Sequence, residues 1–238
     1  MSLDVYSLDE LARHLGRDRR EIEWLVSRGR IPGRKTENGW MFHEREITQW
    51  LEREIRVYSD PELKAFEESI QPSETRTEIP VSVLMQPETV QVPLDARTRR
   101  SVLESLVEIA GRTWQVWEPA KVLEAVQQRE DALSTAFPEG IAIPHPRNPL
   151  TQSLGSSIVA FGRVPSGIPF GSPAGNLTDL FFLVLCRDSR MHLQVLARLS
   201  RMIRHPGFLD ELRATDSSEE AYDLIRDCDQ QIGGGPGR

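Results

Sequence analysis

Residues 180–186 read LFFLVLC, and this run limits the folds open to the chain more than any other feature. It is the longest apolar run in the 238-residue sequence. It is much too short for a transmembrane helix, which needs about 20 apolar residues. Strands that are covered on both faces give continuous apolar runs of this length. The run therefore predicts a buried β-strand and no insertion into a membrane.

The sequence around this run alternates between helical and extended patterns. Apolar residues recur at helical spacing over residues 98–111, 118–129, 191–204 and 217–229, and short apolar stretches lie at 140–143, 157–164 and 180–186. Helices that alternate with buried strands need a sheet with helices on both of its faces. We expect an α/β domain of this kind over residues 83–232.

The first 56 residues predict a separate small domain. Ser7 and Glu10 fit a capping box at the start of a helix that Gly16 ends. A second helix follows Asp18, and a third spans residues 44–54. Between them, residues 31–42 (IPGRKTENGWMF) read as a β-hairpin. This order predicts a helix-turn-helix domain with a wing over residues 1–56.

Two segments lack the composition of a core. Residues 57–82 are rich in Glu, Ser, Thr and Pro, and they predict a linker with a short helix at 62–69. Residues 233–238 (GGGPGR) predict a flexible tail.

The amino-terminal region resembles the excisionase-type helix-turn-helix, a relative of the MerR winged-helix group. The resemblance rests on "SLDELARHLG", "RREIEWLVSRGRIPGRK", "GWMF" and "EITQWLE". It implies DNA binding, with the second helix in the major groove. The candidate DNA contacts are Arg19, Arg20, Arg28, Arg34 and Lys35.

Charge leaves a second interpretation of this region open. Residues 1–57 hold eleven Lys and Arg residues and eleven Asp and Glu residues, whereas a DNA-binding domain is usually basic. The positive side chains cluster around the second helix and the wing, which favours contacts with phosphates or guanine edges. The alternative is a solvated charged surface on a protein-docking adaptor.

His145 stands between Pro144 and Pro146 at the end of a short apolar stretch, GIAIPHPR. The residues alone permit two interpretations. One is a loop histidine between turn-forming prolines. The other is a rigidly held acceptor of a phosphoryl group, because proline fixes φ and in-line transfer depends mainly on positioning.

The run REDALSTAFPEGIAIPHPR, residues 129–147, resembles the active-site segment of enzyme IIA of the phosphoenolpyruvate-dependent sugar phosphotransferase system, fructose/mannitol type. The resemblance continues through residue 228. It implies a mixed sheet flanked by helices. It also implies that His145 becomes phosphorylated, with His192 and Arg129 as its active-site partners and the Ser134 and Thr135 hydroxyls as further donors. Where relatives often carry a glycine-rich GSTGIGNG loop, this chain has the bulkier LSTAFPEG.

The resemblance also implies partners. The donor would be the histidine phosphocarrier protein, and the acceptor would be an enzyme IIB. Two functions remain open: a phosphohistidine carrier coupled to DNA binding as a regulator, or a transport-type enzyme IIA with a docking module. The only cysteines, Cys186 and Cys228, form no CxxC motif, so we expect no disulfide framework, no metal site and no cofactor in a cytoplasmic protein.

Overall fold

The computed structural model describes residues 5–70 and 80–233, and these fall into two units. One unit contains the described residues up to 70 together with the helical segment 196–201. The other contains residues 80–195 and 202–233. Each unit is described separately below.

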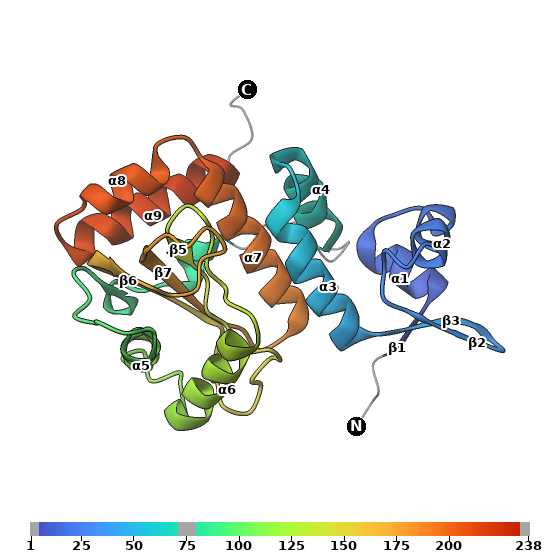
Figure 1. Ribbon diagram of the computed structural model, residues 1–238, viewed down its shortest axis with the longest axis horizontal. Helices are drawn as coiled ribbons and strands as arrows, with labels where there is room; N and C mark the ends of the chain where they lie inside the picture. Colours follow the sequence, from blue (N-terminus) through green and yellow to red (C-terminus); the bar gives the residue numbers. More distant parts are fainter. Residues whose placement is uncertain (1–4, 71–79, 234–238) are drawn as a thin grey trace. The chain divides into compact units, whose positions relative to one another are not determined.

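The first unit is a small helical unit with a three-stranded sheet. Its elements are β1 (Val5–Ser7), α1 (Leu8–Leu15), α2 (Arg19–Ser27), β2 (Arg34–Thr36), β3 (Gly39–His43), α3 (Glu44–Val57) and α4 (Asp60–Ile70). Strands β2 and β3 form the expected hairpin, and β1 adds an antiparallel strand on the other side of β3. The pair α1 and α2 with this hairpin is the winged helix-turn-helix arrangement (Figure 1).

Local signals explain where α1 begins and ends. The Ser7 side chain accepts a hydrogen bond from the Glu10 amide, and the Glu10 carboxylate accepts one from the Ser7 amide at 2.8 Å. Gly16 then adopts φ +60°, a left-handed conformation that costs glycine little. The capping box and the glycine stop are therefore confirmed.

Ser7→Ala should lower the melting temperature of the first unit by about 4–8 °C at neutral pH, as expected for a lost N-cap in a domain of this size. Hydrogen bonds from Ser7 lower the pKa of Glu10. A carboxylate whose folded-state pKa is lowered stabilises the fold above its unfolded-state pKa, and that contribution is lost as the pH falls through the folded-state value. The difference in melting temperature between wild type and Ser7→Ala should therefore become smaller as the pH is lowered. Thermal melts followed by circular dichroism from pH 7 to pH 3 would measure it, and a gap that widens in acid would contradict the assignment.

Helix α4 lies in a stretch whose composition predicts a linker. Tyr58, Leu63 and Phe66 are buried, and the Tyr58 and Phe66 rings meet edge to face with centroids 6.3 Å apart. Helix α4 contacts α1 within the first unit. Residues 58–70 are thus packed rather than extended, and α4 (Asp60–Ile70) spans the short helix expected at 62–69, with Leu63 and Phe66 on its buried face. Predicted linker residues 71–79 and tail residues 234–238 lie outside the described part of the chain.

The second unit is built on a four-stranded sheet in the order β4-β6-β7-β5. Its strands are β4 (Val90–Gln91), β5 (Ile141–Ala142), β6 (Ile158–Ile168) and β7 (Thr178–Leu185). Two short 3-10 helices, η1 (Val81–Leu84) and η2 (Pro87–Thr89), precede β4. The helices are α5 (Arg99–Gly111), α6 (Pro119–Ala132), α7 (Ser189–Arg204), α8 (Phe208–Ala214) and α9 (Ser218–Gly233). Strands β6 and β7 pair antiparallel, whereas β4 and β5 pair parallel to their neighbours, so the sheet is mixed.

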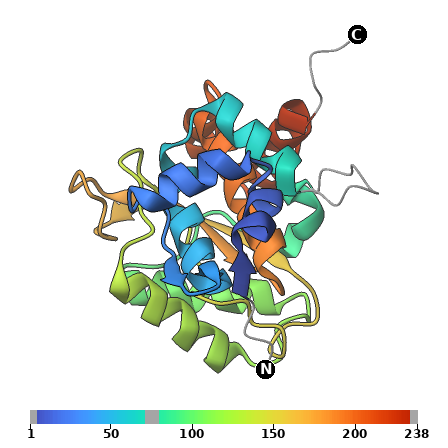
Figure 2. The same ribbon diagram turned by 90° about the vertical axis from the view of Figure 1, so that its right-hand side faces the viewer.

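Strand β7 is buried on both faces, as its apolar run predicts. The Phe181 ring packs against Phe170, 5.1 Å between centroids, on the face that α5 and α6 cover. The Phe182 ring packs against Phe161 at 4.7 Å. Figures 1 and 2 show α5 and α6, in green, on one side of the sheet and α7, α8 and α9, in orange to red, on the other. The expected α/β class with helices on both faces is confirmed.

Within the described residues, no helix combines the length and the apolar character that a membrane crossing requires.

Candidate functional site

Residues 140–144 are held along β7 by backbone hydrogen bonds. The Asp179 amide donates to the Gly140 carbonyl at 2.8 Å, and the Val184 amide donates to the Pro144 carbonyl at 2.9 Å. Strand β5 pairs parallel to β7 between these two points. Gly140 adopts φ +83°, which lets the chain turn into the strand. The backbone is therefore fixed up to the residue before His145.

The His145 ring is oriented by its own strand. Its Nδ1 lies 2.7 Å from the Ile143 carbonyl oxygen. A carbonyl oxygen only accepts hydrogen bonds, so Nδ1 carries the hydrogen. In a neutral imidazole the lone pair is then on Nε2. The geometry thus places the lone pair of a neutral His145 ring on Nε2.

His192 meets His145 from the first turns of α7. The Asp188 side chain caps this helix by accepting from the Met191 amide at 2.8 Å. The His145 and His192 ring centroids are 4.9 Å apart, with the planes tilted by 57°. The structure therefore brings together two histidines that are 47 positions apart in the sequence.

Ser134 and Thr135 direct their hydroxyl groups to protein atoms. Ser134 Oγ donates to the Phe170 carbonyl at 3.0 Å. Thr135 Oγ1 donates to Glu130 Oε2 at 2.6 Å, and the Thr135 amide donates to Glu130 Oε1 at 2.9 Å. Glu130 is fully buried and was not among the site residues that the sequence suggests. Its only sequence signal is its place in the Arg-Glu pair that precedes the Ser-Thr pair.

Arg129 lies in the last turn of α6. Its Nη1 donates to the Leu133 carbonyl at 2.8 Å, at the carboxyl end of its own helix. The structure places Arg129 next to the buried Glu130, three residues before α6 ends at Ala132.

The candidate DNA contacts surround α2 and the wing. Arg19 Nε pairs with Asp9 at 3.0 Å, and Arg34 pairs with Glu46 at 3.4 Å. The Arg28 guanidinium lies over the indole of Trp24, 4.6 Å from the ring centroid, and that indole is 50% exposed. Arg20 and Lys35 are also exposed. Trp24, which the sequence did not single out, thus adds an aromatic surface to the exposed side of α2.

A family model described as the phosphoenolpyruvate-dependent sugar phosphotransferase system, EIIA 2, matches residues 83–228. The chain belongs to this family. It is thereby a phosphotransferase of the enzyme IIA type, a family that works through a phosphohistidine. A second model, described as a helix-turn-helix domain, matches residues 5–54. Both resemblances drawn from the sequence are confirmed.

Relatives of this enzyme IIA domain occur alone and within larger proteins. The nitrogen regulatory protein of Bradyrhizobium diazoefficiens is 30% identical over 149 residues, which are 62% of this chain and 95% of that protein. The fructose-specific EIIABC component of Bacillus subtilis is 26% identical over 152 residues, 63% of this chain. The matched part is only 24% of that component.

Solved structures share the enzyme IIA fold. Nitrogen regulatory protein IIA-Ntr of Neisseria meningitidis has a TM-score of 0.55 at 22% identity, covering 61% of this chain and 98% of that one. Mannitol IIA of Escherichia coli has a TM-score of 0.52 at 23% identity, covering 59% of this chain and 97% of that one.

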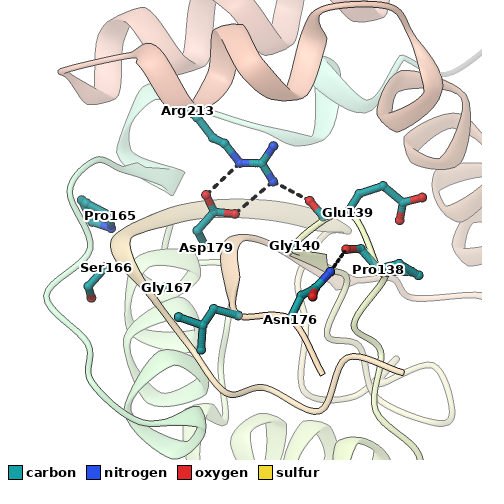
Figure 3. A pocket seen from close by; sticks show the side chains of 10 residues that line it. Pro138, Glu139, Gly140, Pro165, Ser166, Gly167, Asn176, Asp179 and Arg213 are labelled. Carbon is teal, nitrogen blue, oxygen red and sulfur yellow. Dashed lines mark hydrogen bonds and ion pairs between the residues drawn. The ribbon is translucent and has the colours of Figure 1, made fainter. Parts of the chain in front are cut away.

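A pocket of about 370 Å³ lies at the opposite end of β5 from His145 (Figure 3). Arg213 of α8 pairs with Asp179 there, with Nε and Oδ2 2.8 Å apart, and its Nη2 donates to the Glu139 carbonyl at 2.5 Å. The bond to Asp179 raises the pKa of Arg213, which favours the charged pair. Asn176 donates to the Pro138 carbonyl at 2.9 Å. These contacts anchor the loop that enters β5, so this end of the enzyme IIA domain supports the His145 segment.

Cys186 follows β7 and should be chemically inert in the folded chain. Burial raises the pKa of its thiol to about 12. At pH 8 only about one molecule in ten thousand would then carry the reactive thiolate. Iodoacetamide should leave Cys186 unmodified in the native protein and label it after unfolding in guanidinium, as peptide mass spectrometry would detect. Equal labelling in both states would contradict the burial of this side chain.

Proposed function

We propose that His145 of this enzyme IIA domain accepts a phosphoryl group from the histidine phosphocarrier protein. The observation that carries the proposal is the hydrogen bond of 2.7 Å from His145 Nδ1 to the Ile143 carbonyl, which leaves the lone pair on Nε2. A bond forms between Nε2 and phosphorus while the bond from phosphorus to the donor's imidazole nitrogen breaks. The donor nitrogen keeps the electron pair of that bond. Because neutral imidazole attacks and neutral imidazole leaves, the step needs no net proton transfer.

We infer that His192 supports this step. Its ring lies beside that of His145, at a centroid distance of 4.9 Å. A ring N–H from His192 would donate to a phosphoryl oxygen as charge spreads over the three equatorial oxygens. The start of α7 adds the positive end of a helix dipole. We assign Arg129, in the last turn of α6, as the further active-site partner that the resemblance implies.

The test is to map the modification. The full chain would be incubated with phosphoenolpyruvate, enzyme I and the histidine phosphocarrier protein, and then analysed by mass spectrometry under conditions that preserve acid-labile phosphate. We expect one phosphoryl group on His145 and none in His145→Ala. Omission of the phosphocarrier should abolish labelling of the wild type. Phosphate on another residue, or no phosphate, would refute the proposal.

We further propose that phosphorylation of His145 regulates DNA binding by the helix-turn-helix. A phosphoryl group adds a charge of about −1.5 to −2 at pH 7, enough to change contacts made by the enzyme IIA domain. The exposed side chains of α2 and the wing, among them Arg20, Lys35 and the Trp24–Arg28 pair, support contact with duplex DNA. DNA occupancy would then report the phosphorylation state of the sugar system.

Duplexes selected from a random pool by the unmodified protein would provide the DNA for the test. Their affinity would be measured for unmodified wild type, phosphorylated wild type and His145→Ala exposed to the phosphorylation mixture. Regulation predicts that only the phosphorylated wild type differs. Lys35→Ala should also flatten the dependence of log K on log salt by about 0.9, the contribution of one phosphate contact. Equal affinities in all three samples would exclude the regulatory proposal.

The competing proposal is onward transfer to an enzyme IIB during sugar uptake. It is supported by the shared fold with Escherichia coli enzyme IIA mannitol in a complex with phosphorylated enzyme IIB, at a TM-score of 0.54 and 22% identity over 60% of this chain and 99% of that one. Adding a purified enzyme IIB to the phosphorylated chain should then discharge His145. If phosphate never leaves His145, the transport role fails. Both proposed reactions suit the cytoplasm, where thiols such as those of Cys186 and Cys228, which form no disulfide, stay reduced.

A further inference from the structure

We propose that Glu130 is a positioning residue for His145: it acts through Thr135 and the Ile143 peptide to fix which ring nitrogen attacks. The inference rests on the proposed phosphorylation of His145. Glu130 touches neither the imidazole nor the phosphoryl group in this proposal. It sets the position of the carbonyl that holds the imidazole.

The first step is the contact between Glu130 and Thr135. Glu130 is 1% exposed, and a carboxylate in such a place is costly unless its oxygens accept hydrogen bonds. Oε1 accepts from the Thr135 amide at 2.9 Å, and Oε2 accepts from the Thr135 hydroxyl at 2.6 Å. Two bonds from one residue to one carboxylate fix both the backbone and the side chain of Thr135. These two hydrogen bonds thereby hold the loop after α6 against the end of that helix.

The second step leads from Thr135 to the strand that carries the site. Residues 135–137 run alongside β5 on the side away from β7. The Ile143 amide donates to the Thr135 carbonyl at 3.4 Å, Ala136 pairs with Ala142, and the Phe137 amide donates to the Ile141 carbonyl at 2.7 Å. The two-residue strand β5 is therefore held from both sides.

The third step is the Ile143 carbonyl, which accepts from His145 Nδ1 at 2.7 Å. The peptide that contains this carbonyl is anchored on one side through the Ile143 amide and on the other through the Pro144 carbonyl, which accepts from Val184. Without the Thr135 anchor, the first of these supports is lost. The carbonyl can then tilt, and the hydrogen on Nδ1 loses its acceptor. The tautomer with hydrogen on Nε2, which cannot attack from that atom, gains population.

The experiment compares three variants in the full chain with a matched control. Glu130→Ala removes both bonds to Thr135, Thr135→Val removes only the hydroxyl bond, and Thr135→Ser restores it. The control is Glu118→Gln at the N-cap of α6, the opposite end of the helix from Glu130, where Glu118 accepts from Ser153 at 2.8 Å. Two readouts are needed: single-turnover transfer from the phosphorylated histidine phosphocarrier protein, and the ¹⁵N shifts of the His145 ring, which report its tautomer.

We expect transfer to slow by about 100-fold in Glu130→Ala and by about 10-fold in Thr135→Val, the range expected when a reacting group is displaced by up to 1 Å. In both variants, a larger fraction of the His145 rings should carry the hydrogen on Nε2. Thr135→Ser and Glu118→Gln should stay within about twofold of the wild type in rate and keep its tautomer. If Glu130→Ala does not fold, the comparison of Thr135→Val with Thr135→Ser still tests whether the bond to Glu130 positions the His145 ring.

The inference would be overturned if folded Thr135→Val and Glu130→Ala kept the wild-type tautomer and the wild-type transfer rate. It would also be overturned if transfer slowed while the tautomer stayed unchanged, because slower transfer alone indicates a purely structural role. If the wild type is not phosphorylated on His145, the proposed function fails instead. The tautomer comparison then still tests whether Glu130 orients the ring.

Discussion

His192→Ala should slow phosphoryl transfer to His145 by about 100- to 1000-fold while the phosphate still arrives on His145. This is the loss expected when one donor to a developing negative charge is removed. The His145 and His192 ring centroids lie 4.9 Å apart, so His192 stands directly beside the proposed acceptor. Rapid-quench measurements with phosphorylated histidine phosphocarrier protein would give the single-turnover rate. Peptide mapping would show the residue that carries the phosphate.

Two further variants separate a hydrogen-bond role from a packing role. His192→Gln keeps an N–H donor at the start of α7, so its rate should lie between those of wild type and His192→Ala. His205→Ala removes a histidine from the carboxyl end of the same helix and should transfer at the wild-type rate. A rate for His192→Ala within about threefold of the wild type would show that this ring does not support the transferred group.

The α/β class could be predicted because its signals are local, whereas the roles of His145 and His192 are implied only by the resemblance to enzyme IIA, since the residues alone leave a loop histidine open. The apolar run of β7 requires burial on both faces, and the prolines around His145 mark the end of a strand. Asp188 has the residue type and position of a helix cap, which places His192 in the first turns of α7. That the two rings meet follows from the parallel pairing of β5 with β7, which the residues alone do not show.

Other features could not be predicted because their partners are distant or their signals are weak. Strand β4 has two residues, and only pairing with Phe161 and Gly162 defines it. The short helix expected at 62–69 is present as α4, but its polar composition does not show that Leu63 and Phe66 are buried. Glu130 lies in a charged Arg-Glu-Asp run that suggests a solvated surface, and only the turn of the chain after α6 brings Thr135 onto its carboxylate.

Phe181→Ala should reduce the free energy of unfolding of the second unit by about 3–5 kcal/mol, the usual cost of deleting a fully buried aromatic ring. Phe181 has no exposed surface and packs against Phe170 at 5.1 Å. In a unit of roughly 150 residues the melting temperature should fall by about 6–20 °C. Guanidinium denaturation followed by circular dichroism would measure the change. Leu177→Ala is the matched control. The Leu177 side chain, just before β7, is 54% exposed, so its removal should change the free energy of unfolding by less than about 0.5 kcal/mol.

The position of Phe181 also connects this loss of stability to the site. Its register partner is Ala142, the last residue of β5, which lies three residues before His145. A cavity at Phe181 therefore opens beside β5, the strand that leads to the His145 ring. Well below its melting temperature, Phe181→Ala should transfer phosphate more slowly than Leu177→Ala although both chains are folded, because β5 has lost packing on the side of β7. Equal transfer rates would show that the hydrogen bonds along β5 hold His145 in place without support from the core. A loss of stability under about 1 kcal/mol would instead contradict the burial of the ring itself.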